Sequence, residues 1–142
     1  MTLYDLLDAI ADSFNPGLGM IAMAQLLRIS VHRQWQRAGI YLATLLALTT
    51  VIYGLMVVDR NLFDFPYSTH SAFAACFCTL HAAYMPRFKL LWMGLLVCYL
   101  GLILFQGYHS WLDIAVTLIL VMPFIAIIFK LLKPSRALSY QQ

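Results

Sequence analysis

The sequence predicts an all-helical membrane protein whose helices cross the bilayer several times. Of its 142 residues, 63% are hydrophobic and only 11% are charged, so no polar run is long enough to form a water-soluble shell. The stretch from Ala38 to Val58 contains no charged residue, and a spanning helix needs about 20 mostly apolar residues. The chain therefore has room for about four to six short-looped helices in one bundle.

We expect about five transmembrane helices, over residues 17–29, 38–58, 69–85, 88–106 and 110–129. The first of these is short and spans only with tilt or local thinning of the bilayer. The third is rich in alanine, whose small side chain lets helices approach closely, so it is expected inside the bundle. Pro123 should kink the last helix, and Pro134 should end it.

The segment Met1 to Phe14 has a different pattern. Leucine and isoleucine side chains occupy one helical face, and Asp5, Asp8 and Asp12 occupy the other. This pattern is typical of an amphipathic helix lying in the membrane interface, and the break is expected at Asn15-Pro16-Gly17. With no basic residues at its start, the segment is not expected to be a cleaved secretory signal. We therefore divide the chain into an interfacial helix (residues 1–14), a membrane domain (15–134) and a cytoplasmic tail (135–142).

The distribution of basic residues predicts the orientation of the bundle. Eight of them fall on one side in this topology and only Arg60 falls on the other; the eight are Arg28, Arg33, Arg37, Arg87, Lys89, Lys130, Lys133 and Arg136. Lysine and arginine favour cytoplasmic loops, so that side is expected to be cytoplasmic. The cluster Arg28, Arg33 and Arg37 with Trp35 either sets this topology or binds anionic lipid headgroups.

The cysteines give no sign of a disulfide framework or a metal site. Cys76, Cys78 and Cys98 are odd in number and lie in apolar segments, without further ligands at zinc spacing. We expect no metal and no cofactor.

Two histidines carry the predicted chemistry. His70 and His109 begin helices at the same membrane face, because the chain between them forms a hairpin that crosses the membrane and returns. Asp113 follows His109 by one helical turn and is placed to orient its imidazole by a hydrogen bond. Two histidines and a carboxylate suit covalent phosphotransfer, in which one imidazole attacks phosphorus and the other protonates the leaving oxygen. The alternative is that the aspartate and histidine form a structural pair that only joins helix ends in the membrane interface.

At these residues the chain resembles the type 2 phosphatidic acid phosphatase superfamily. Tyr67-Ser68-Thr69-His70-Ser71 is similar to its Pro-Ser-Gly-His signature, and His109 to Asp113 is similar to its His-x-x-x-Asp signature. The sphingomyelin synthase-related branch, with Asp-x-x-Phe-Ser-Gly-His-Thr, is matched more closely by Asp64 to Ser71. The resemblance covers Asp59 to Pro134, about half of the chain.

The resemblance implies a role for each matching residue. His109 is the implied nucleophile, Asp113 its orienting partner, His70 the acid and base, and Asp64 an auxiliary acid. Tyr67, Ser68 and Ser71 are implied to border the substrate. Arg60 and Tyr108, in the two outer loops, either contact the headgroup or anchor the chain at the interface.

The departures from the family pattern concern phosphate binding. The Lys-x6-Arg-Pro motif is absent, Leu102 and Ile103 replace the Ser-Arg pair, and Thr69 replaces the glycine. A phosphomonoester dianion would lack its usual cationic partners, which favours a phosphodiester substrate. The family complement of six helices is also incomplete, so a second copy or a partner membrane subunit could supply a helix.

The resulting expectation is a multi-pass membrane lipid phosphotransferase. It moves a phosphate-linked headgroup from a phospholipid donor to a lipid alcohol acceptor through a phosphohistidine at the non-cytoplasmic face. Two alternatives stay open: a lipid phosphatase acting on phosphatidate or a polyprenyl diphosphate, and a catalytically silent membrane scaffold. No nucleic-acid partner is expected. His81 is interpreted as a hydrogen-bonded residue inside the bundle.

Overall fold

The chain folds into a bundle of helices that alternate in direction. A computed structural model describes residues 2–63 and 66–132, and all regular elements within these ranges are helical. The long helices are α1 (Leu3–Val31), α2 (Trp35–Val58), α3 (Thr69–Tyr84), α4 (Lys89–Phe105) and α5 (Trp111–Leu132). A π-helical turn η1 (Asp59–Phe63) follows α2, and a 3-10 turn η2 (Pro86–Phe88) joins α3 to α4.

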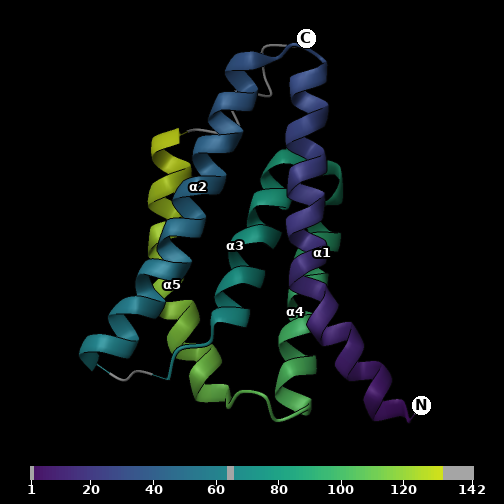
Figure 1. Ribbon diagram of the computed structural model, residues 1–142, viewed down its shortest axis with the longest axis vertical. Helices are drawn as coiled ribbons and strands as arrows, with labels where there is room; N and C mark the ends of the chain where they lie inside the picture. The colour runs from purple at the N-terminus through teal and green to yellow at the C-terminus, as the bar shows by residue number, and fades with distance from the viewer. Residues whose placement is uncertain (1, 64–65, 133–142) are drawn as a thin grey trace.

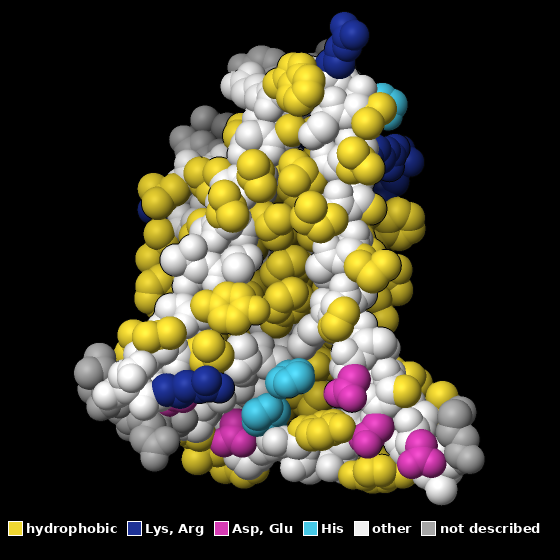
Figure 2. All heavy atoms as spheres, in the orientation of Figure 1, with side chains coloured by type: hydrophobic (Ala, Val, Ile, Leu, Met, Phe, Trp, Pro, Cys, Tyr) yellow, Lys and Arg dark blue, Asp and Glu magenta, His cyan; other side chains and the backbone are white. Residues whose placement is uncertain are grey.

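The alternating directions give the bundle two chemically different ends (Figure 1). The histidine end contains the start of α1, the start of α3 and the turn between α4 and α5. The basic end contains the turn between α1 and α2, together with η2. Figure 2 shows aspartate and histidine side chains gathered at the histidine end, with hydrophobic side chains over the middle of the same face.

Three helices of the described chain are long and apolar enough to cross a membrane: Trp35–Asn61, Pro86–Phe105 and Trp111–Leu132. The all-helical fold is confirmed, and three of the five expected spans, residues 38–58, 88–106 and 110–129, fall largely on these candidate membrane helices. The other two expected spans, residues 17–29 and 69–85, are not among these helices. α3 has 16 residues and so measures about 24 Å, less than the hydrocarbon core of a typical bilayer at about 30 Å.

α3 is the central helix of the bundle. It contacts each of the other four long helices, and most of its side chains are buried. Ala72, Ala74 and Ala75 have no accessible surface, so the neighbouring helices approach its backbone directly. The expected place of this segment inside the bundle is confirmed.

The expected break at Asn15-Pro16-Gly17 is wrong, because α1 runs unbroken through it. Proline removes one backbone hydrogen bond from a helix, but its fixed φ is compatible with helical geometry. Contacts on both sides of Pro16 hold α1 in place: Phe14 stacks on Tyr99 of α4 with ring centroids 4.2 Å apart, and Leu18 is buried in the core. The N-terminal part of α1 leans away from the bundle, as a proline-containing helix commonly bends (Figure 1).

The aspartate face of α1 is also partly used inside the protein. Asp8 Oδ1 accepts hydrogen bonds from Gln106 Nε2 at 2.9 Å and from Tyr108 Oη at 3.0 Å, and both donors follow α4. The Tyr4 hydroxyl donates to the Gln106 carbonyl at 3.0 Å. The start of α1 is therefore bound to the turn between α4 and α5.

His81 fits its interpretation as a hydrogen-bonded residue inside the bundle. His81 is fully buried, with Nε2 3.1 Å from the Leu18 carbonyl and Nδ1 3.3 Å from Gln25 Oε1. The three cysteines are free, with Cys76 and Cys78 buried and Cys98 exposed. Pro123 lies inside α5, which continues to Leu132, whereas Pro134 lies outside the described residues.

Replacing Ala75 by leucine should destabilise the bundle, because the alanine has no accessible surface and the larger side chain must push α3 away from its neighbours. Overpacking of this kind costs about 1–3 kcal/mol. Thermal unfolding in detergent should show a lower midpoint for Ala75→Leu than for Ala43→Leu, a matched change at an exposed position of α2. Equal midpoints would contradict the central place of α3.

Candidate active site

His70 and His109 meet at the histidine end of the bundle. His70 lies in the first turn of α3, and His109 lies in the turn just before α5. Their ring centroids are 6.0 Å apart, with the ring planes tilted by 47°. The prediction that both histidines return to one face is therefore confirmed, although His109 precedes its helix instead of beginning it.

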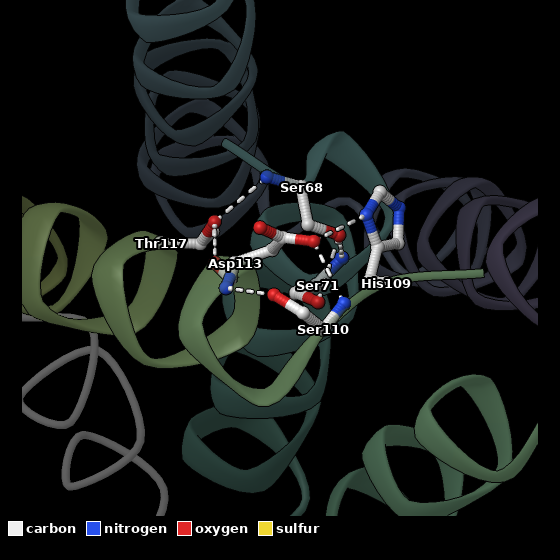
Figure 3. A network of polar contacts seen from close by, with 6 residues as sticks. All are labelled: Ser68, Ser71, His109, Ser110, Asp113 and Thr117. Atoms are coloured by element: carbon white, nitrogen blue, oxygen red, sulfur yellow. Dashed lines mark hydrogen bonds and ion pairs between the residues drawn. The ribbon is translucent and has the colours of Figure 1, made fainter. Parts of the chain in front are cut away.

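Asp113 contacts His109 and also caps α5. Its Oδ2 lies 3.6 Å from His109 Nδ1, an ion-pair distance that exceeds a normal hydrogen bond (Figure 3). The same oxygen accepts a 2.7 Å hydrogen bond from the Ser110 backbone N–H, and Ser110 Oγ accepts from the Asp113 N–H at 3.2 Å. This reciprocal pair is a capping box, which fixes the carboxylate in place beside the imidazole.

A short polar chain joins the start of α3 to α5 (Figure 3). The buried Ser68 N–H donates to Thr117 Oγ1 at 2.7 Å, and that hydroxyl donates to the Asp113 carbonyl at 2.6 Å. Ser68 Oγ in turn caps α3 by accepting from the Ser71 N–H at 3.2 Å. His70, between these two serines, is thus held at a fixed position relative to Asp113.

α1 supplies the support for the second imidazole. Asn15 Nδ2 lies 3.5 Å from His70 Nδ1, 3.3 Å from the His70 carbonyl and 3.2 Å from the Tyr99 hydroxyl. The Asn15 amide can present either its nitrogen or its oxygen to His70 Nδ1, so this contact orients the ring without assigning its tautomer.

His109 faces a carboxylate, whereas His70 faces an amide. His109 Nδ1 faces the Asp113 carboxylate, which can only accept while ionised, so the neutral ring carries its proton on Nδ1. Its Nε2 points away from Asp113 (Figure 3). His109 therefore offers a lone pair on Nε2, beside the second imidazole of His70.

The two imidazoles border one small cavity. It has a volume of about 90 Å³, enough for a few water molecules or one small anionic group. Asp12, Tyr99 and Tyr108 also border it, and none of its described lining residues is a lysine or arginine. Among the described residues, no three histidine, cysteine or acidic side chains are grouped as metal ligands.

Burial lowers the pKa of His109 below its ordinary value, because desolvation disfavours the imidazolium. The Asp113 carboxylate opposes this effect, and nearby His70 adds to it. His109 is therefore mostly neutral at pH 7, the state in which an imidazole can act as a nucleophile.

Not all residues predicted for the site border this cavity. His70, His109 and Tyr108 do, and Asp113 contacts it through His109. Ser68 and Ser71 are buried in the capping network, and the Tyr67 hydroxyl donates to the Ile52 carbonyl at 3.0 Å, so all three have contacts within the protein. Arg60 is exposed on η1 and is not among the lining residues. Asp64 lies outside the described residues.

Sequence analysis missed the contribution of α1 to this site. Asp12 was assigned to a polar face in the membrane interface, and Asn15 to a helix break. The available signal was their nearness along the chain: in an unbroken helix, residues three apart lie on the same face. Tyr99 gave no signal, because a tyrosine in an apolar helix is usually a packing residue.

Comparisons of the chain with family models, curated proteins and solved structures found no match.

Replacing Asp113 by asparagine should lower the pKa of His109 further. The carboxylate stabilises the imidazolium, whereas the amide removes the charge and keeps an oxygen that can accept from Ser110. NMR titration of histidine-labelled protein should give a wild-type pKa below the ordinary 6.5 and a lower one in Asp113→Asn. Circular dichroism controls for the intact helix, and a higher or unchanged pKa in the variant would contradict this geometry.

Proposed function

We propose that the protein is a membrane lipid phosphotransferase that moves a phosphate-linked headgroup from a phospholipid to a lipid alcohol. The observation that carries the proposal is the pair of imidazoles on one cavity. His109 is oriented by Asp113 and His70 by Asn15, so that His109 Nε2 can attack and the protonated form of His70 can donate a proton. The resemblance of these segments to the phosphatidic acid phosphatase signatures supports the same assignment.

The proposed reaction has two steps. In the first, His109 Nε2 attacks the phosphorus of the donor, the bond from phosphorus to the glyceride oxygen breaks, and His70, in its protonated imidazolium form, gives its Nε2 proton to that oxygen and becomes neutral. In the second, His70 removes the proton of the acceptor hydroxyl, whose oxygen attacks phosphorus while the N–P bond to His109 breaks. Asp113 stabilises the positive charge on the ring of His109 in both steps.

The charges around the cavity favour a phosphodiester over a phosphomonoester. A monoester carries close to two negative charges at neutral pH and is normally bound by arginine or lysine. The described lining offers no such cation and includes the Asp12 carboxylate, which repels anions. A diester has a single negative charge and is repelled less. The cavity volume of about 90 Å³ has room for a phosphate-sized group but not for acyl chains, which would lie outside it, in the membrane.

We also propose that the site faces away from the cytoplasm. The described basic residues at the basic end are Arg28, Arg33, Arg37, Arg87, Lys89 and Lys130, whereas Arg60 is at the histidine end. A cytoplasmic basic end follows the usual distribution of these residues and places the histidines at the opposite surface.

The proposal is tested with the purified protein in vesicles that contain a headgroup-labelled phospholipid and a lipid alcohol. The wild type should transfer label to the alcohol. His109→Ala should abolish transfer because the nucleophile is lost, and His70→Ala should slow it by about 100-fold or more because the general acid and base is lost. Gln36→Ala, an exposed change at the basic end, is the matched control and should keep full activity.

The products distinguish the alternatives. A water-soluble labelled product without transfer to the alcohol would show that the protein is a hydrolase and not a transferase. Equal inactivity of the wild type and His109→Ala on all donors, with lipid binding retained, would support a scaffold and overturn the proposal.

A further inference from the structure

The basic end of the bundle contains a second and larger cavity. Its volume is about 420 Å³, within the range of sites that bind small molecules, about 300–1,000 Å³. The last turn of α1, the turn into α2, the first turn of α2 and the end of α3 form its walls. The histidine cavity is at the other end of these helices, so the two sites are separate.

The cavity is lined by positive charge without a matching acid. Arg28 and Arg37 border it, together with His32, and none of its described lining residues is acidic. Within residues 2–63 and 66–132, the one ion pair is His109 with Asp113, so neither arginine is neutralised by a described carboxylate. All six acidic residues of the sequence are aspartates, and the described ones lie on elements of the histidine end or beside it.

Arg37 is held in this cavity with a donor to spare. Its Nη1 donates to Gln34 Oε1 at 3.1 Å, which fixes the guanidinium. Its Nε is buried and has no hydrogen-bond acceptor among the described residues. Gln25, another lining residue, uses its Oε1 to accept from the Tyr41 hydroxyl at 2.8 Å, while its buried Nε2 likewise lacks a described acceptor. Buried donors without acceptors are costly, and both of these belong to side chains that border the cavity.

The start of α2 adds to the positive potential. Gln34, at the N-cap, forms no capping hydrogen bond with its side chain, so no capping side chain accepts from the first backbone N–H groups of the helix. A helix N-terminus carries partial positive charge and binds phosphate groups in many proteins. Arg33 has a φ of 55° and its N–H donates to the Ser30 carbonyl at 2.9 Å, which closes the turn that brings α1 and α2 together.

We infer that this cavity binds a phosphate-bearing anion through Arg28 and Arg37, either the headgroup of an anionic phospholipid or soluble phosphate. The planar guanidinium pairs with phosphate oxygens through two parallel hydrogen bonds, which makes arginine well suited to this group. The inference does not depend on the proposed function, because neither cavity shares a lining residue with the other.

The test uses the full chain in a neutral detergent and measures affinity by thermal shift and native mass spectrometry. The probes are dioctanoyl phosphatidylglycerol and inorganic phosphate, compared with dioctanoyl phosphatidylcholine and with sodium chloride at equal ionic strength. Arg37→Gln and Arg28→Gln should each lower the affinity for the probe that binds by about tenfold or more, because each removes one charge-assisted contact. Arg33→Gln removes the same charge from an exposed neighbour that does not line the cavity, and should change affinity by less than about twofold.

The two probes separate the sources of the phosphate. Binding of the lipid without competition from phosphate identifies a membrane headgroup, and displacement by phosphate identifies a soluble ligand. If Arg37→Gln does not fold, the exposed Arg28→Gln still gives the answer. The inference is overturned if the wild type prefers neither probe to its control, or if Arg33→Gln weakens binding as much as the two cavity variants.

Discussion

The arrangement of the histidine end depends on one buried hydrogen bond, from the Ser68 N–H to Thr117 Oγ1. This contact joins the start of α3 to the second turn of α5, and the same hydroxyl continues to the Asp113 carbonyl. In an apolar surrounding, an unpaired backbone N–H is costly, so the bond strongly favours one position of α3 along α5. Because His70 follows Ser68 by two residues and Asp113 precedes Thr117 by one turn, fixing this pair also fixes the two catalytic candidates relative to each other.

The main features of the fold could be predicted because they follow from local sequence patterns. Hydrophobicity alone predicts a helix over the charge-free stretch from Ala38 to Val58, and this stretch forms most of α2. The alanines of α3 predicted close packing, and α3 is the helix that contacts all the others. The expected spans 88–106 and 110–129 leave a short turn between them, and Gly107 in that turn has a φ of 72°, a conformation that favours glycine.

The contribution of α1 could not be predicted in the same way, because it depends on contacts between distant segments. Pro16 is a strong local signal for a helix break, yet stacking of Phe14 on Tyr99 and burial of Leu18 hold the helix through it. Asn15 reaches His70 only because the helix continues. The serines near His70 show the reverse case: the residues matched the signature, but their side chains form the cap of α3. A motif predicts which residues are near one another more reliably than it predicts what each side chain contacts.

The two cavities divide the surface chemistry of the bundle between its ends. At the histidine end, two imidazoles and a carboxylate can hold and transfer protons, and no described lysine or arginine is there to attract a dianion. At the basic end, two arginines border the cavity, with no acidic side chain beside them in the described lining. The proposed reaction and the proposed anion binding thus concern different cavities, and the reaction needs only the first.

Trapping the phosphohistidine intermediate is the most direct test of the covalent role of His109. The protein is mixed with a phosphorus-labelled phospholipid in the absence of an acceptor, quenched in base, and digested for mass spectrometry. We predict label on the peptide that contains His109, stable in base and lost in acid, absent from His109→Ala and slower to form in His70→Ala. Transfer of headgroup by a wild type that never carries the label, or equal labelling of His109→Ala, would contradict the account.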